Sequence, residues 1–181
     1  KAYLSWLGKD VPKGVKPVGA GIQEITFLNR AADPKKGRIL YLAKCQSCHG
    51  KDGQGLKNKD ASGYLYPPLW GEKSYNVSAG MFRISRFAAF VKHNMPFTPV
   101  KMDPRLTDAE AWDLAAYVNS QQRTRKFFRY DWKEISSKPV DYPFGPYADN
   151  FNEDQHKYGP FTLMKKPVST PSNKPASGPA K

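Results

Sequence analysis

The sequence Cys45-Gln46-Ser47-Cys48-His49 contains both cysteines of the 181-residue chain and is the most informative stretch in it. Two thiols three positions apart on a tight helical turn can each bond a vinyl carbon of haem. The adjacent histidine then lies under the iron and supplies an imidazole nitrogen. Because this is the attachment pattern of c-type haem, we expect one haem c, joined through two thioethers to Cys45 and Cys48, with His49 as an iron ligand.

Two other interpretations of the motif lack the context that they need. A thioredoxin-like dithiol belongs to a βαβ unit, and no such pattern surrounds these residues. A structural zinc site takes four ligands, but the chain has no second cysteine pair. Two cysteines also exclude a disulfide-rich scaffold.

The segment before the motif predicts a helix that leads directly into it. Asp33-Pro34 is a typical helix start, with Asp as the N-cap and Pro in the first helical position. We expect this helix to run to about Lys44. Gly37 within it costs about 1 kcal/mol relative to Ala, which indicates that another part of the chain packs close to it.

Two further helices are predicted after the motif. Residues 78–93 carry apolar side chains at helical spacing, and Pro96 ends that helix. Thr107 and Glu110 form a capping box that opens a third helix, which ends near Ser120. The apolar positions are Met81, Ile84, Ala88 and Val91 in one helix and Ala111, Leu114, Ala115 and Val118 in the other. Residues 50–77 and 94–105 are predicted to be loops.

The second ring nitrogen of His49 needs a partner, which in metal-binding histidines is often a backbone carbonyl. The loop Tyr66-Pro67-Pro68-Leu69 offers a proline carbonyl, so Pro67 and Pro68 belong to the predicted cofactor site. The alternative is that the two prolines only stiffen the loop.

Four methionines compete for the other axial position of the iron: Met81, Met95, Met102 and Met164. We favour Met95, because it follows a helix and precedes Pro96, a rigid turn that can present a thioether. Lys101, Met102, His93 and an open site remain alternatives. A thioether ligand raises the reduction potential relative to a second imidazole.

The remaining candidate residues have less specific interpretations. Met81 is predicted to pack in the core, His93 to be a partly exposed residue at a helix end, and His156 to be a surface or capping residue. No nucleophile–base pair, phosphate loop or metalloprotease helix is present, so we predict no catalytic residue.

Composition divides the chain into an arm (1–31), a haem domain (32–122), a wrapping extension (123–164) and a disordered basic tail (165–181). In the arm, Tyr3, Leu4, Trp6 and Leu7 form a short apolar helical patch. The chain begins at Lys1 without a visible signal peptide, so we expect it to be processed or partial. No apolar stretch is long enough to span a membrane.

Charge points to the kind of partner. Lys and Arg number 29 against 16 acidic residues, a net charge of +13. Such a field favours docking onto an acidic redox protein or an anionic membrane surface. Because the cations are scattered along the chain, nucleic-acid binding is not expected.

The helix, haem motif, proline loop, Met-Pro turn and capped helix are together typical of a class I cytochrome c. Several stretches are more specific: CHGKDGQG (48–55), YPPLWG (66–71), GM (80–81), NMP (94–96), DLAAYVNS (113–120), KPVD (138–141), GPYAD (145–149) and QHKYGPF (155–161). Over about residues 33–161 the chain resembles the second haem domain of the dihaem thiosulfate dehydrogenases.

This resemblance implies a relay role. In that family, catalysis takes place at the first haem, which has a cysteine as its distal ligand, and the second haem passes electrons outward. The present chain has one haem motif and no third cysteine. In some relatives a lysine beside the ligand methionine competes for the iron, and here that position is Asn94.

We therefore predict an all-α class I cytochrome c fold, with about three main helices around one covalent haem and extended N- and C-terminal arms. The predicted function is one-electron transfer by a monohaem cytochrome in an extracytoplasmic, periplasmic respiratory or sulfur-oxidation chain. The alternative is an electron-relay domain, subunit or fragment of a thiosulfate dehydrogenase or tetrathionate reductase. A third possibility is a structural haem domain in a larger complex, docked through Phe127, Phe128, Tyr130 and Trp132.

Overall fold

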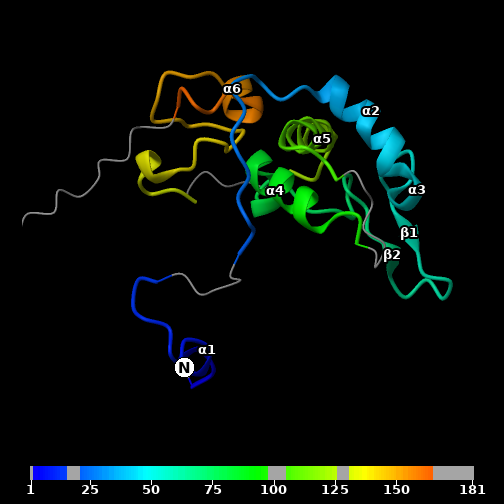
Figure 1. The fold of residues 1–181 in the computed structure, drawn as a ribbon, viewed down its shortest axis with the longest axis horizontal. Helices are drawn as coiled ribbons and strands as arrows, with labels where there is room; N and C mark the ends of the chain where they lie inside the picture. Colours follow the sequence, from blue (N-terminus) through cyan, green and yellow to red (C-terminus); the bar gives the residue numbers. More distant parts are fainter. Residues whose placement is uncertain (1, 16–20, 98–104, 126–130, 165–181) are drawn as a thin grey trace, which may run out of the picture.

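Three helices carry the central part of the structure: α2 (Pro34–Lys44), α4 (Ile84–Asn94) and α5 (Asp108–Ser120). They are seen in a computed structural model that describes residues 2–15, 21–97, 105–125 and 131–164. Figure 1 shows α4 and α5 at the centre, with α2 on one side of them. The predicted all-α fold is confirmed.

Helix α2 begins where the sequence predicts. The Asp33 carboxylate accepts hydrogen bonds from the backbone N–H of Lys35 at 2.8 Å and of Lys36 at 3.3 Å. The close packing expected at Gly37 is also present, because a Cβ there would lie 1.9 Å from the carbonyl oxygen of Asp113 on α5. The backbones of α2 and α5 therefore cross in direct contact.

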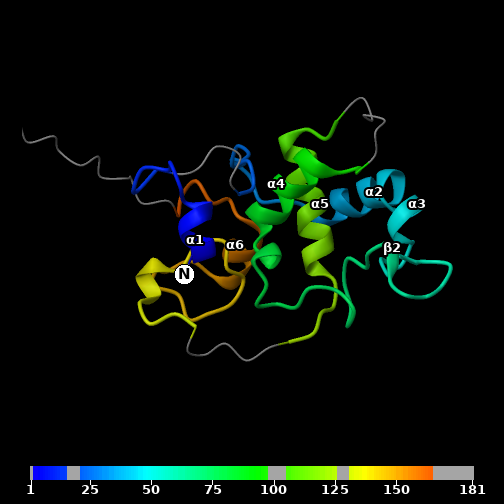
Figure 2. The ribbon, with the colours of Figure 1, turned by 90° about the horizontal axis from the view of Figure 1, so that it is seen from below.

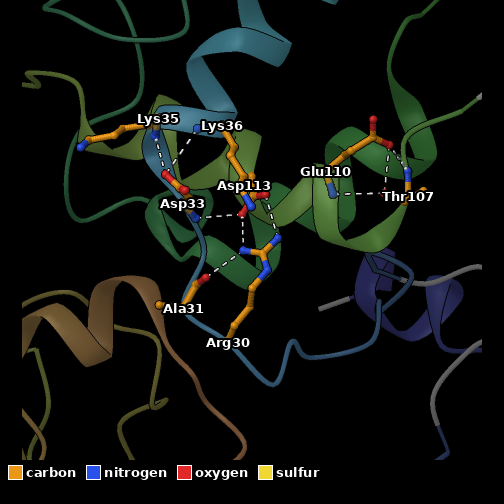
Figure 3. Close-up of polar contacts among 8 residues, drawn as sticks. All are labelled: Arg30, Ala31, Asp33, Lys35, Lys36, Thr107, Glu110 and Asp113. Carbon is orange, nitrogen blue, oxygen red and sulfur yellow. Dashed lines mark hydrogen bonds and ion pairs between the residues drawn. The ribbon is translucent and has the colours of Figure 1, made fainter.

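Helix α5 has the predicted capping box. The Glu110 N–H donates to the Thr107 hydroxyl, and the Glu110 carboxylate accepts from the Thr107 N–H (Figure 3). One turn further on, Asp113 accepts two hydrogen bonds from Arg30, at 2.7 and 2.8 Å, and one from the Asp33 N–H at 2.8 Å. Asp113 thus ties the segment before α2 to α5.

Helix α4 starts later than predicted. A 3-10 turn, η1 (Gly80–Phe82), precedes it, and the backbone is extended at Arg83, so a single helix over 78–93 is wrong. The predicted apolar residues Ile84, Ala88 and Val91 are nevertheless buried. The helical periodicity was correct, but it did not reveal the break before Ile84.

Several short elements complete the described chain. Helix α3 (Gln46–His49) follows α2, and β1 (Leu56–Lys57) pairs antiparallel with β2 (Tyr64–Tyr66) in a stretch predicted to be a loop. Strands this short give no alternation that a sequence pattern can detect. Helix α1 (Ala2–Leu7) coincides with the predicted apolar patch, and Figure 1 shows it set apart from the other helices.

The C-terminal extension contains η2 (Ile135–Ser137) and α6 (Glu153–Tyr158). Both views place α6 on the side of α5 opposite to α3 (Figures 1 and 2). The sequence indicated no regular element here, although Asn152 caps α6 by accepting from the Gln155 N–H at 2.8 Å. The predicted tail (165–181) and three residues of the predicted docking patch, Phe127, Phe128 and Tyr130, lie outside the described residues; Trp132 packs against Tyr142.

The core joins the helices to both flanking segments. Trp112 on α5 is almost fully buried, and its indole N–H donates to the carbonyl of Thr26 at 2.8 Å. Its ring packs against Phe27 and Phe161. Among the described residues, no helix has the length and apolar character needed to cross a bilayer.

Candidate haem site

The two cysteines lie on one tight turn between α2 and α3. Cys45 ends α2 by donating its N–H to the carbonyl of Tyr41, and its own carbonyl accepts from Cys48 at 3.2 Å and His49 at 3.0 Å. The two thiols are not bonded to each other. Burial raises the pKa of the Cys45 thiol to about 11, so it is protonated at neutral pH.

The imidazole of His49 is held by the proline loop. Its Nδ1 lies 2.8 Å from the carbonyl oxygen of Pro67. Because a carbonyl only accepts, Nδ1 must carry the hydrogen, and the lone pair of Nε2 is left to bind a metal. The hydrogen bond expected from the sequence is thus present at Pro67, and Pro68, the next residue in the chain, is buried.

Backbone contacts press this loop against α3. The Gly55 N–H donates to the carbonyl of His49 at 2.8 Å, and the Leu69 N–H donates to the carbonyl of Gly53 at 2.8 Å. Gly55 has φ +72°, and a Cβ there would lie 2.2 Å from the carbonyl oxygen of Tyr66. Only glycine allows the chain to pass so close to the loop that orients the histidine.

Tyr41 connects the motif to α5. Its hydroxyl donates to the carbonyl of Gly50 at 2.5 Å, directly after His49. Its ring is completely buried and packs against Trp70 and Tyr117, with centroid distances of 5.1 and 5.4 Å. The orientation of the motif therefore depends on the crossing of α2 and α5.

The candidate distal ligand lies at the far end of α4. Met95 is the C-cap of this helix, donates its N–H to the carbonyl of Val91 at 3.0 Å, and packs half-buried against the core. Its competitors Met102 and Lys101 lie outside the described residues. Met81 packs against the core as predicted, and Met164 is itself buried in it.

One histidine agrees with its predicted environment and one does not. His93 lies in the last turn of α4 and is partly exposed, as predicted, although its Nε2 atom is buried and has no hydrogen-bond partner in the described part of the chain. His156 is 2% exposed, so its assignment to the surface is wrong. Its Nδ1 contacts the carbonyl of Val140 at 2.7 Å, and its Nε2 contacts Asp149 at 3.0 Å.

These residues fit a c-type haem. Two unpaired thiols and an oriented imidazole occupy one turn, and a thioether ends a second helix. Within the described ranges, His, Cys, Asp and Glu side chains form no group of three or more that could hold a metal ion without such a cofactor.

Comparison with known proteins agrees with this geometry. Residues 34–122 match the family model of cytochrome c. This region is a cytochrome c domain. Domains of this family carry covalently bound haem c, and the Cys45-x-x-Cys48-His49 motif provides the attachment pattern.

The domain and its extension are similar to parts of longer proteins. The chain is 46% identical over 122 residues to the thiosulfate dehydrogenase of Allochromatium vinosum, covering 67% of this chain and 43% of that protein. It is 36% identical over 146 residues to the thiosulfate dehydrogenase of Psychrobacter arcticus, covering 80% and 40%. The chain thus spans less than half the length of these relatives.

A solved structure extends the similarity to the fold. Thiosulfate dehydrogenase (TsdBA) from Marichromatium purpuratum, in its "as isolated" form, aligns with a TM-score of 0.60 and 35% identity. The alignment covers 81% of this chain and 30% of that one. The class I cytochrome c fold and the predicted resemblance to the thiosulfate dehydrogenases are confirmed.

Proposed function

We propose that this chain is an electron-transfer module carrying one haem c, attached to Cys45 and Cys48 and ligated by His49 and Met95. The observation that carries the proposal is the hydrogen bond from His49 Nδ1 to Pro67, directly after the Cys-x-x-Cys turn. An iron with two protein ligands leaves no position for a substrate. The proposed role is therefore that of a carrier without catalytic residues.

The bound haem supplies a one-electron change between ferric and ferrous iron. The Pro67 carbonyl fixes the ring of His49 and makes its Nε2 a better electron donor. The thioether of Met95 favours the reduced state more than a second imidazole would. Pro68 is proposed to hold the Pro67 carbonyl in place.

Replacement of the distal ligand tests the assignment. In the purified haem protein, Met95→Ala should lower the reduction potential and let imidazole or cyanide bind the iron. Absorbance and spectroelectrochemical titration measure both effects. An unchanged spectrum would show that Met95 is not the ligand.

His93→Ala is the matched control, because His93 lies two positions before Met95 and its buried Nε2 has no hydrogen-bond partner among the described residues. This variant should keep the wild-type spectrum and potential. If it, rather than Met95→Ala, opens the iron to imidazole, His93 is the ligand.

The charge supports an acidic redox protein as the partner. The chain carries a net charge of +13, and a field of this sign accelerates docking onto an acidic surface. The rate of electron transfer to such a partner should fall steeply as salt is added. We place this exchange outside the cytoplasm, in the periplasm or at a membrane surface, as c-type haem is generally attached after export.

A second function is favoured by the relatives. The two relatives and the solved structure described above are thiosulfate dehydrogenases, so the second proposed function is that of the relay part of such an enzyme or of a tetrathionate reductase. Intact mass and haem content of the native protein separate the two functions. One haem on a chain of this length supports a carrier or subunit; two haems on a longer chain, with thiosulfate turnover, support the enzyme.

A further inference from the structure

The start of α4 is held by a residue from outside the cytochrome c match. Arg83, at the N-cap position, makes no side-chain hydrogen bond to the first turn of the helix. Instead, one oxygen of Asp141 accepts from the backbone N–H of Ser85 at 3.2 Å and from its hydroxyl. The extension thus supplies the cap that the helix lacks.

The same carboxylate neutralises the residue before the helix. Its other oxygen accepts from Arg83 Nε at 2.9 Å and Nη2 at 2.6 Å. The side chain of Asp141 is 2% exposed and that of Arg83 is 20% exposed. All four bonds converge on one buried carboxylate, so a single residue fixes both the charge and the backbone at the start of α4.

Asp141 is itself held in place by α6. The carbonyl of its neighbour Val140 contacts His156 Nδ1 at 2.7 Å, and the ring of His156 stacks on Tyr147 at 3.5 Å. The carbonyl of Tyr158, at the end of α6, accepts from the Ala32 N–H at 2.8 Å. The carboxylate is therefore presented by an anchored segment.

Helix α4 connects this anchor to the candidate axial ligand. Its 11 residues span about 16 Å, and Met95 follows its last residue. A cleft of about 270 Å³, lined by Ile25, Arg86, Ala89 and others, borders the Arg83–Asp141 pair. Where the start of α4 borders this cleft, it is held by the hydrogen bonds of Asp141 to Arg83 and Ser85.

We propose that Asp141 is a positioning residue for the distal haem ligand: it fixes the start of α4 and so sets how firmly Met95 is held on the iron. The inference rests on the proposed ligation by Met95. It assigns a role to the C-terminal extension that reaches beyond wrapping the domain.

The test compares two buried carboxylates in the haem-loaded protein. Asp113 matches Asp141, because each accepts paired bonds from an arginine and one from a backbone N–H. Asp141→Asn should bind imidazole at least about tenfold more tightly than wild type, because apparent affinity scales with the fraction of open iron. Its reduction potential should fall as well. Asp113→Asn should lose stability in denaturant titrations without either change.

The inference is overturned if both variants alter imidazole affinity equally, or if neither does. Should Asp141→Asn fail to incorporate haem, Ser85→Ala removes one donor to Asp141 and leaves the ion pair intact. A smaller gain in imidazole affinity is expected there, and none in the control Ser137→Ala, whose hydroxyl donates to the backbone carbonyl of Glu134. Equal affinities in the two serine variants would overturn the inference.

Failure of the ligand assignment gives a different result. If Met95→Ala leaves spectrum and potential unchanged, the proposed ligation fails and this inference fails with it. If Met95→Ala opens the iron but Asp141→Asn behaves like Asp113→Asn, only the positioning role is lost.

Discussion

The N-terminal ends of α2 and α4 are capped in different ways. Helix α2 has its own cap, Asp33, and a second carboxylate, Asp113, binds Arg30 and the Asp33 N–H (Figure 3). Helix α4 has no cap of its own and depends on Asp141, more than 50 residues later in the chain. The start of α2 is therefore specified by residues next to it in the chain and by α5, whereas the start of α4 requires the C-terminal extension.

Removing each of the two carboxylates in turn should have the largest effect on stability and should show most clearly how the two helix starts differ. Asp141→Ala should lower the free energy of unfolding by about 3–5 kcal/mol, because it leaves a largely buried arginine without a counter-charge. Asp113→Ala should cost less, about 1–3 kcal/mol, since the side chain of Arg30 is 43% exposed and can be hydrated. Denaturant titration of the haem-loaded variants, followed by circular dichroism, measures both.

A second substitution checks the cause. If the orphaned charge of Arg83 accounts for the loss, adding Arg83→Leu to Asp141→Ala should recover part of the stability. Equal losses in the two single variants, or no recovery in the double variant, would contradict the distinction between the two helix starts.

What could be predicted from the sequence follows the same division. The caps of α2 and α5 lie within three residues of the helices that they start, so Asp33, Thr107 and Glu110 were recognised. The haem motif was recognised because its spacing is itself chemical information, and a proline carbonyl of the 66–69 loop was expected as the partner of His49, although only the structure shows that it is the carbonyl of Pro67. The start of α4 and the burial of His156 were missed, since their partners are distant in the chain and no local pattern links them.

The crossing of α2 and α5 gives the next largest effect. Gly37→Ala would bring a Cβ within 1.9 Å of the carbonyl oxygen of Asp113 and 2.8 Å of Tyr117. The helices would have to separate, at a cost of about 1–3 kcal/mol. Thermal or chemical unfolding of the haem-loaded protein measures the loss.

Gly80 is the matched control near the start of α4. A Cβ at this position meets nothing within 4 Å. Gly80→Ala should therefore change stability by no more than about 0.5 kcal/mol. If the two variants were equally stable, the backbone contact between α2 and α5 would not be as close as described.

Local caps should have smaller effects. Thr107→Ala removes the hydroxyl that accepts the Glu110 N–H at 3.2 Å and should cost about 1 kcal/mol. Asn152→Ala removes the equivalent bond at the start of α6 and should cost a similar amount. Because α6 anchors Asp141, only the second variant should also raise imidazole affinity; the same rise in both would argue against that connection.

The smallest expected effect is the pH dependence of the stability that the local caps of α2 and α5 contribute. The pKa of Glu110 is lowered by the hydrogen bond from the Thr107 N–H, and the pKa of Asp33 is lowered by the bond from the Lys35 N–H. A carboxylate with a depressed folded pKa contributes stability above its unfolded pKa and loses it as pH falls through the folded value. The local caps of α2 and α5 should therefore weaken progressively below about pH 4.5.

Glutamine keeps the capping-box geometry without a titrating group. Glu110→Gln should therefore flatten the decline of stability between pH 5 and pH 3, at little cost near neutrality. If the slope were the same in the variant and the wild type, the bond from Thr107 would not be strong enough to favour the ionised form, and the start of α5 would depend on packing more than on its local cap.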